Sequence, residues 1–354
     1  MKILCTGISG IQKLRFIQEL KPFLAKHDQR VEIFDTWEYL SSAGADLGQL
    51  ITKEKVLDLH NLDALRAIAF ERISTEIENL LKDDSNQHII ISTHACFRWN
   101  KFLRSGFDVH YLNRIDPDIY VNFVDDINTI HENLSKDSQW ANRLSLEEII
   151  TWRDEEMFLT ETFAMFQKKQ FYLIATSETI ASLGNMILNP GRKKIYLSFP
   201  ITAIQQEQPE LLDDASAIAD ELRKHYTVFN PLSIKDLRES DSHKAQRRKV
   251  QKQLKAATVW RDFKLISQSD IVAVYYPVEK NSPGVNQEIM YAFTHGKDVY
   301  IYYPKRFGMS PFWDPEIAVT KSFDDLDDFH SFLKELSNHD RKSTKGKSRN
   351  NQLN

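Results

Sequence analysis

The sequence predicts an α/β protein made of two doubly wound parallel-sheet domains, and three observations support this. Short apolar runs alternate with segments of helical periodicity along most of the chain. A turn-rich, charged break at residues 189–193 interrupts the alternation, and a second series of strands and helices then begins. With 354 residues, the chain is long enough for two separate hydrophobic cores.

The composition is that of a soluble globular protein with a formal net charge of −4. This charge gives no general attraction to nucleic acid or to a membrane surface. No apolar run is long enough to span a bilayer, and the first residues lack the apolar core of a signal peptide. Cys5 and Cys96 lie in apolar runs without zinc-ligand spacing, so we expect buried free thiols, no metal site and a cytoplasmic protein.

In the first half, apolar runs separated by helical segments predict a five-stranded parallel sheet. The strongest predicted helices are residues 62–81 and 146–166, and Ser145 with Glu148 forms a predicted capping box at the start of the second. A shorter amphipathic helix is expected at residues 14–24. The strands are predicted at residues 3–5, 30–35, 88–94, 118–124 and 171–175.

The second half repeats this alternation without repeating the sequence. A basic helix is expected at residues 242–254, and another helix runs from Glu288 to Gly296. From about residue 338 the chain is polar and rich in Lys, Ser and Asn, which predicts a disordered tail at residues 338–354. Strands are predicted at residues 194–199, 226–230, 270–275 and 299–303, so the domains are residues 1–188 and 194–337, joined by a linker at 189–193.

A glycine-containing loop follows the first predicted strand, where a phosphate-binding loop belongs. Compared with G-x-x-x-x-G-K-[ST], the chain keeps Gly7 and Lys13, but Gln12 replaces the second glycine and Leu14 replaces the magnesium-binding hydroxyl. We expect Gly7, Gly10 and Lys13 to form a loose phosphate nest that binds a nucleotide without turnover. The alternative is a scaffold that no longer binds nucleotide.

With this loop, residues 1–188 resemble the adenylate-kinase-like P-loop nucleoside monophosphate kinases, especially the compact archaeal type. Ser92-Thr-His94 matches the Asp-Thr-His strand end of that family without its aspartate, and residues 143–156 resemble the helix after its lid. The predicted lid, at about residues 128–143, has one arginine where such kinases have several. The resemblance implies a degenerate kinase-like domain, with kinase activity as an alternative to nucleotide sensing or oligomerisation.

In the second half, a carboxylate begins a helix directly after a glycine turn at a predicted strand end. Ser282-Pro-Gly284 follows the strand at residues 270–275, and Glu288 lies near the start of the next helix. Open α/β sheets bind ligands at this position. The alternative is that Glu288 is only a helix-start acid favoured by the helix dipole.

Two further residues accompany Glu288 in a fixed order. Tyr196 lies within the first strand of the second half, and Asp262 begins the helical run that leads to Ser269-Asp270. Residues 194–320 thereby resemble the nucleoside 2-deoxyribosyltransferase family, including its branch of deoxynucleoside 5'-monophosphate N-glycosidases. Asp262 and Glu288 are 26 residues apart, as expected in the transferases, and the resemblance implies a flavodoxin-like fold.

The resemblance implies cleavage of an N-glycosidic bond, by hydrolysis or by transfer of the sugar, through an oxocarbenium-like transition state. Glu288 would be the nucleophile, ionised and held by the Tyr196 hydroxyl. Asp262 would share a proton with the leaving base, which requires a raised pKa. No cofactor is required, although the first domain is expected to bind a nucleotide. A regulatory protein that binds nucleotides without turnover is the alternative.

Ser282 carries the prediction about the substrate. The related transferases of free nucleosides have an aspartate at this position, six residues before the nucleophile. A carboxylate about 4 Å from a phosphate would cost on the order of 4 kcal/mol at an effective dielectric of about 20, whereas the Ser282 hydroxyl and the Gly284 amide would donate hydrogen bonds. We therefore favour a 5'-phosphorylated substrate over a free nucleoside, with Phe199 and Asn230 as further binding residues and a homo-oligomer as the assembly.

Overall fold

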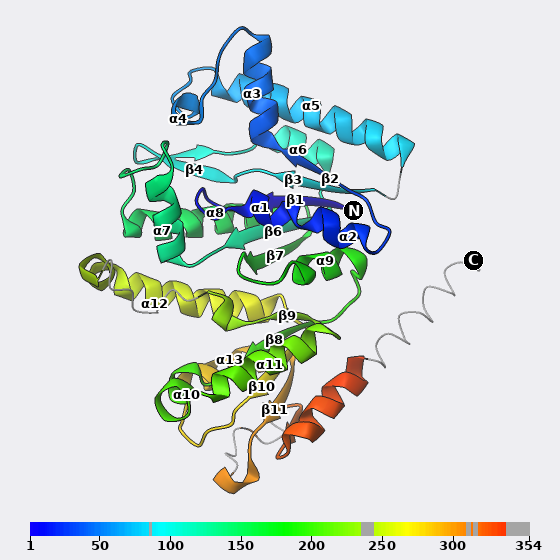
Figure 1. Cartoon of the computed structure of the whole chain (residues 1–354), viewed down its shortest axis with the longest axis vertical. Helices are drawn as coiled ribbons and strands as arrows, with labels where there is room; N and C mark the ends of the chain where they lie inside the picture. The colour runs from blue at the N-terminus through cyan, green and yellow to red at the C-terminus, as the bar shows by residue number, and fades with distance from the viewer. Residues whose placement is uncertain (85–86, 235–243, 309–312, 314–317, 338–354) are drawn as a thin grey trace. The chain divides into compact units, whose positions relative to one another are not determined.

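The computed structural model describes residues 1–84, 87–234, 244–308, 313 and 318–337 (Figure 1). The chain divides into two compact units: the first comprises residues 1–184 and 233–258, and the second comprises 185–232 and the described part of 259–354. The predicted linker lies inside the second unit, a few residues after the point where that unit begins. The predicted tail lies outside the described residues.

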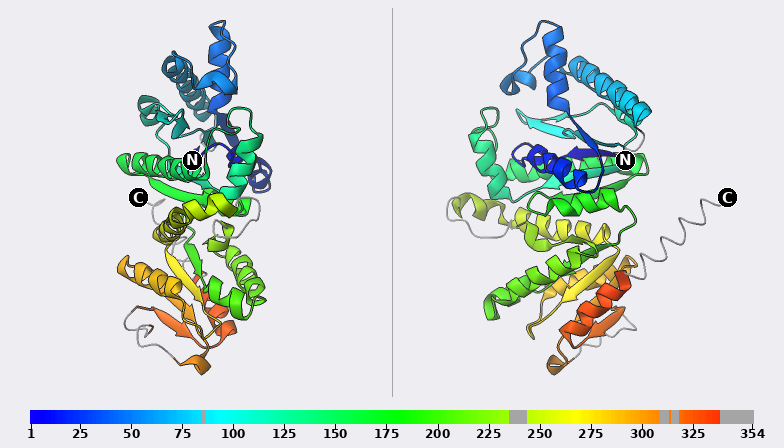
Figure 2. Two further views of the ribbon diagram at one scale, coloured as in Figure 1. Left: turned by 90° about the vertical axis from the view of Figure 1, so that its left-hand side faces the viewer. Right: turned by 45° about the vertical axis from the view of Figure 1, so that its right-hand side comes forward.

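The first unit is built on a parallel sheet of five strands in the order β2-β3-β1-β6-β7. The central strand β1 pairs with β3 on one side, where Leu4 lies opposite Ile91, and with β6 on the other, where Leu4 lies opposite Tyr120. Helices lie on both faces of the sheet (Figure 2), which explains why its strands are largely apolar. The strands are β1 (Lys2–Thr6), β2 (Val31–Asp35), β3 (His88–Ser92), β6 (Ile119–Val124) and β7 (Gln170–Ala175), which confirms the five predicted strands to within two residues.

The three helices predicted for the first unit are present, and one of them is broken. The predicted helix at residues 14–24 is divided into two short helices. Pro22 explains the division, because it has no N–H to donate to the carbonyl of Gln18, four residues before it. The capping box of Ser145 and Glu148 is confirmed. The helices are α1 (Lys13–Gln18), α2 (Leu20–Ala25), α3 (Thr36–Asp46), α4 (Lys53–Val56), α5 (Leu62–Asp83), α6 (Val109–Ile115), α7 (Ile127–Lys136), α8 (Leu146–Phe166) and α9 (Ile180–Leu188), which runs across the unit boundary.

An antiparallel hairpin of β4 (Cys96–Trp99) and β5 (Phe102–Ser105) was not predicted. Its second strand is exposed along its whole length, so it lacks the apolar signature by which the buried strands were found. Cys5 and Cys96 are buried and free, as predicted.

The second unit has a parallel sheet in the order β12-β11-β10-β8-β9. β8 (Lys194–Ser198) lies between β9 (Thr227–Phe229) and β10 (Ile271–Tyr275), so the direction in which strands are added reverses between β8 and β10. The C-terminal edge at such a reversal is where open α/β sheets bind ligands. The remaining strands are β11 (Asp298–Tyr302) and the short edge strand β12 (Lys321–Phe323), of which only β11 was predicted.

The helices of the second unit cover both faces of this sheet (Figure 2). The basic helix predicted to end at residue 254 continues to Ser267, because Leu265 and Ile266 are buried and extend its apolar face. The helices are α10 (Ile201–Glu207), α11 (Leu211–Arg223), α12 (Lys244–Ser267), whose residues up to Thr258 belong to the first unit, α13 (Pro283–Thr294), and a last helix at residues 326–337.

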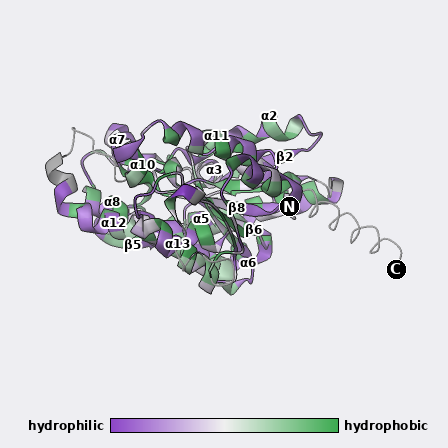
Figure 3. Cartoon of the chain, turned by 90° about the horizontal axis from the view of Figure 1, so that it is seen from below, coloured by the Kyte–Doolittle hydropathy of each residue, from purple (hydrophilic) through white to green (hydrophobic). Residues whose placement is uncertain are grey.

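Both sheets form the hydrophobic interior of their units, and much of the outer surface of the helices is hydrophilic (Figure 3). Tyr196 and Tyr275 are among the largest fully buried side chains of the second unit. Within the described residues, every helix is too short or too polar to cross a membrane.

Candidate active site

Helix α13 presents Glu288 to strand β8. The helix begins at Ser282, whose Oγ accepts a hydrogen bond from the Val285 amide at 3.5 Å, and Pro283 follows at the first helical position. From this start, the Tyr196 hydroxyl donates to Glu288 Oε1 at 3.2 Å and the Ser198 hydroxyl donates to Oε2 at 2.5 Å. Both β8 side chains are fully buried, and two residues of spacing place them on the same face of the strand.

The second carboxylate comes from α12. Arg261 donates from Nε and Nη2 to Asp262 Oδ1, at 3.3 and 3.2 Å, and the two side chains are 9% and 17% exposed. The next residue, Phe263, stacks on the Tyr291 ring of α13 with 4.3 Å between ring centroids. This stack fixes the part of α12 that carries Asp262 against the helix that carries Glu288.

The two carboxyl groups are electrostatically coupled. Burial, and secondarily the negative charge of Asp262, raises the pKa of Glu288 to about 8, although the Ser198 and Tyr196 hydroxyls oppose the rise. Burial and the nearby Glu288 and Asp262 charges raise the pKa of Tyr196 well above its usual value, so Tyr196 remains a proton donor. The raised pKa favours a proton on Glu288, whereas the sequence led us to expect an ionised Glu288 and a proton on Asp262.

The predicted substrate-binding residues lie around the same edge of the sheet. Phe199 directly follows β8 and is buried, and Asn230 directly follows β9, where its Oδ1 accepts the Leu232 amide at 2.9 Å. Ser282 and Gly284 lie at the N-terminus of α13, and the Ser282 amide donates to the Tyr276 hydroxyl at 2.7 Å. In the free protein, Asn230 and Ser282 therefore have structural partners.

Two residues of the site were missed by sequence reasoning. Ser198 could have been found, because it lies two positions after Tyr196 and must share its face of the strand. Arg261 directly precedes Asp262, but its bond to that carboxylate follows from side-chain conformation, which the sequence does not specify.

The predicted phosphate-binding loop is already bonded to the protein's own groups. The Gly7 amide donates to Glu156 Oε1 at 3.0 Å, and Lys13 Nζ donates to the Gly7 carbonyl at 3.1 Å. Lys13 is 8% exposed, and its Nζ also lies 3.2 Å from His94 Nε2. Gly10 has φ +88°, and a Cβ there would lie 2.9 Å from the Leu134 side chain, so glycine is required at this position.

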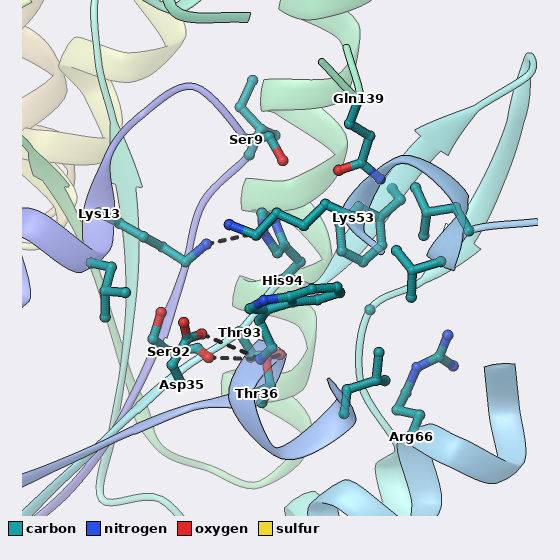
Figure 4. Close-up of a pocket in the computed structure, with 18 of the residues that line it drawn as sticks. Ser9, Lys13, Asp35, Thr36, Lys53, Arg66, Ser92, Thr93, His94 and Gln139 are labelled. Atoms are coloured by element: carbon teal, nitrogen blue, oxygen red, sulfur yellow. Dashed lines mark hydrogen bonds between the residues drawn. The ribbon is translucent and has the colours of Figure 1, made fainter. Parts of the chain in front are cut away.

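A cavity of about 260 Å³ opens beside this loop (Figure 4). Lys13 and Lys53 extend into it from opposite sides, and Arg66 reaches it from α5. Arg66 is 9% exposed, and its hydrogen-bond partner Asp63 has a side chain that is 94% exposed. The rest of the lining combines polar groups at the strand ends with apolar and aromatic walls, including Asp35, Thr36, Ser92, Thr93, Trp37 and Phe70.

No protein-family model and no curated protein matches the chain. Among solved structures, the chain is similar to a 2-deoxyribosyltransferase from the psychrotolerant bacterium Bacillus psychrosaccharolyticus, with 20% identity and a TM-score of 0.31 over 40% of this chain and 95% of the other. It is also similar to the Clostridium botulinum CMP N-glycosidase BcmB, with 15% identity and a TM-score of 0.26 over 42% of this chain and 99% of the other. With TM-scores below 0.5, these similarities establish neither the fold nor the activity of this chain.

The raised pKa of Glu288 predicts that Glu288→Gln stabilises the protein at alkaline pH. The folded state holds a proton on Glu288 between the ordinary pKa of 4.5 and about pH 8, so the wild-type free energy of unfolding falls as pH rises through this window and levels off above it. Because the glutamine does not titrate, its advantage over wild type should grow by on the order of 1 kcal/mol per pH unit up to pH 8. Urea denaturation from pH 5 to 9 measures this.

The matched control is Glu279→Gln, which changes an exposed glutamate of the same unit. Its effect on the free energy of unfolding should be small at every pH. A Glu288→Gln effect of constant size across the pH range would contradict the prediction.

Proposed function

We propose that this protein cleaves the N-glycosidic bond of a nucleoside 5'-monophosphate, with Glu288 as the nucleophile. One observation carries the proposal: Glu288 accepts hydrogen bonds from two buried hydroxyls and is coupled to a second carboxylate, Asp262, at the C-terminal edge of a parallel sheet. Paired carboxyl groups that hold one proton between them suit a reaction that needs one nucleophile and one acid.

In the proposed reaction, the ionised Glu288 carboxylate attacks the anomeric carbon while the bond to the base breaks. The electron pair of the C–N bond leaves with the base, which takes a proton from Asp262. The resulting glycosyl ester on Glu288 is then released by water or by another base. Tyr196 and Ser198 each hold one oxygen of Glu288, which orients the carboxylate for attack.

The N-terminus of α13 supports a 5'-phosphate on the substrate. A helix of 12 residues carries a partial positive charge at this end, which favours an anion. Ser282 is neutral and can turn its hydroxyl from the helix cap to a phosphate oxygen. An aspartate at this position would instead repel the phosphate.

Base release by the purified protein tests the reaction. Incubation with a panel of dNMPs, NMPs and nucleosides, followed by chromatography, should detect free base from at least one monophosphate. Glu288→Gln should lower the rate of release by about 10³-fold or more while substrate binding persists, since the amide keeps the shape of the side chain but is not a nucleophile. Full-rate release by Glu288→Gln, or no release by the folded wild type from any compound, would disprove the proposal.

The substrate assignment predicts a change of preference in Ser282→Asp. The added carboxylate should lower kcat/KM for the monophosphate by about 100-fold or more, because each close charge pair costs on the order of a few kcal/mol. The free nucleoside should lose far less. The control Ser282→Asn, which caps the helix equally well without a charge, should keep the preference for the monophosphate. Equal losses on both substrates in Ser282→Asp would argue against a bound phosphate.

We also propose that the cavity of the first unit binds a nucleotide without turnover. Arg66 supports this proposal. Its guanidinium group is buried and lines the cavity, and its hydrogen-bond partner Asp63 is exposed to solvent. A guanidinium group in this position is well suited to pair with an anion. Trp37 and Phe70 offer apolar surface for a base. The Gly7 amide and Lys13 have internal partners and Leu14 cannot hold magnesium, which argues against phosphoryl transfer.

Calorimetric titration of the Glu288→Gln protein with nucleotides tests this second site without interference from turnover. Arg66→Ala should weaken binding at this site by about 10- to 100-fold, since a charged hydrogen bond is worth roughly 1.5–3 kcal/mol. Arg72→Ala, which removes an arginine on the same helix that pairs with Asp46, is the control and should leave affinity unchanged. Equal affinity in Arg66→Ala and Arg72→Ala would rule out the proposed contact.

A further inference from the structure

We propose that Arg261 is the positioning residue that decides which carboxyl group of the site carries the shared proton, and that it keeps this proton on Glu288 until substrate binds. The inference rests on the proposed function, because it assigns the proton states of the proposed nucleophile and acid.

Two hydrogen bonds join Arg261 to one of the two carboxyl groups, that of Asp262. Arg261 donates twice to Asp262 Oδ1, and at 9% exposure its guanidinium is largely removed from water. Hydrogen bonds from a guanidinium group to a carboxyl oxygen favour the ionised form of that carboxyl group, here Asp262.

Glu288 has different surroundings. The groups of the described residues that face it are the Tyr196 and Ser198 hydroxyls of β8 and the Asp262 carboxylate of α12. The hydroxyls are neutral, and the carboxylate is a like charge that favours the protonated form of Glu288. The raised pKa of Glu288, about 8, agrees with this arrangement. One carboxyl group is thus held ionised by a cation, and the other is held neutral by burial and a neighbouring anion.

The free site therefore holds the one proton that the reaction needs, but this proton is on Glu288 and not on Asp262. The proposed reaction needs an ionised Glu288 and a protonated Asp262, and the free site has the reverse. One transfer corrects this: the proton leaves the Glu288 carboxyl group and binds Asp262, from which the leaving base takes it as the C–N bond breaks. No proton is gained or lost, and Glu288 is left as the anion that bonds to the anomeric carbon.

This arrangement gives Arg261 a role in selectivity. The nucleophile stays neutral in the empty site, and Arg261 opposes the transfer that would activate it. A substrate base that accepts a hydrogen bond from Asp262 favours the protonated form of Asp262 and so promotes the transfer. Activation of Glu288 is thereby linked to the presence of a base that can take the proton.

The pH dependence of kcat/KM for base release tests the proposal. Because the reactive pair holds one proton, the profile should be bell-shaped, with an alkaline limb where the shared proton is lost. Arg261→Gln removes a cation and so raises the proton affinity of the pair, which should move the alkaline limb to higher pH by about one pH unit. Arg261→Lys, the conservative variant, keeps the charge and should keep the limb near its wild-type position. A lower kcat/KM with an unmoved limb in Arg261→Gln would reduce Arg261 to a structural role and overturn the proposal.

Carboxyl ¹³C NMR of the full chain separates this proposal from the proposed function. Resonances assigned with Glu288→Gln and Asp262→Asn should show Glu288 losing its proton near pH 8 in wild type. Asp262 should stay ionised over the measured range in wild type and take up a proton within that range in Arg261→Gln. This readout does not require turnover. A wild-type protein that releases no base but shows these titrations refutes the function and keeps the proton assignment. A wild-type Asp262 that is protonated at pH 6 refutes the proton assignment, whether or not base is released.

Discussion

The contact between strand β8 and helix α13 organises the second unit. Tyr196 and Ser198 reach Glu288 only because β8 lies beside β10, the strand that leads into α13. The pairing of Tyr196 with Val272 sets the register of these two strands, and the cap at Ser282 sets the start of the helix. Since each group comes from a strand or a helix, the position of the Glu288 carboxyl group is fixed by rigid elements before any ligand binds.

Sequence reasoning found the buried strands because a parallel strand covered on both faces is an apolar run, which is a strong local signal. The exposed β5 and the three-residue β12 lack this signal and were missed. In the site, Tyr196, Asp262 and Glu288 were proposed because their order and spacing resemble those of the nucleoside 2-deoxyribosyltransferase family. The raised pKa of Glu288 was not foreseen, because it depends on how deeply each carboxyl group is buried and on which of them the neighbouring arginine contacts.

In the first unit, a residue distant in the sequence occupies one of the donors of a predicted phosphate-binding motif. The loop of Gly7 and Lys13 has the position and part of the sequence of a phosphate-binding loop. Glu156, 149 residues away along the chain from Gly7, accepts the Gly7 amide and leaves that donor unavailable to a phosphate. Such a partner cannot be identified from the loop itself. The neighbouring cavity takes its cationic character from Lys53 and Arg66 as well as from Lys13, and neither of those residues belongs to the motif.

Glu156 and the proposed nucleophile Glu288 have hydrogen-bond donors of different kinds, and this difference bears on which of them can change its protonation state. Glu156 accepts three backbone amides, from Gly7, Ala95 and Cys96, at 2.7 to 3.0 Å. Burial raises the pKa of Glu156, and the three amides, which can only donate, oppose that rise because they favour the ionised form. The partners of Glu288 are hydroxyls, which donate or accept by rotating. Glu288 can therefore lose or gain a proton while keeping both hydrogen bonds, as its proposed role as a nucleophile requires.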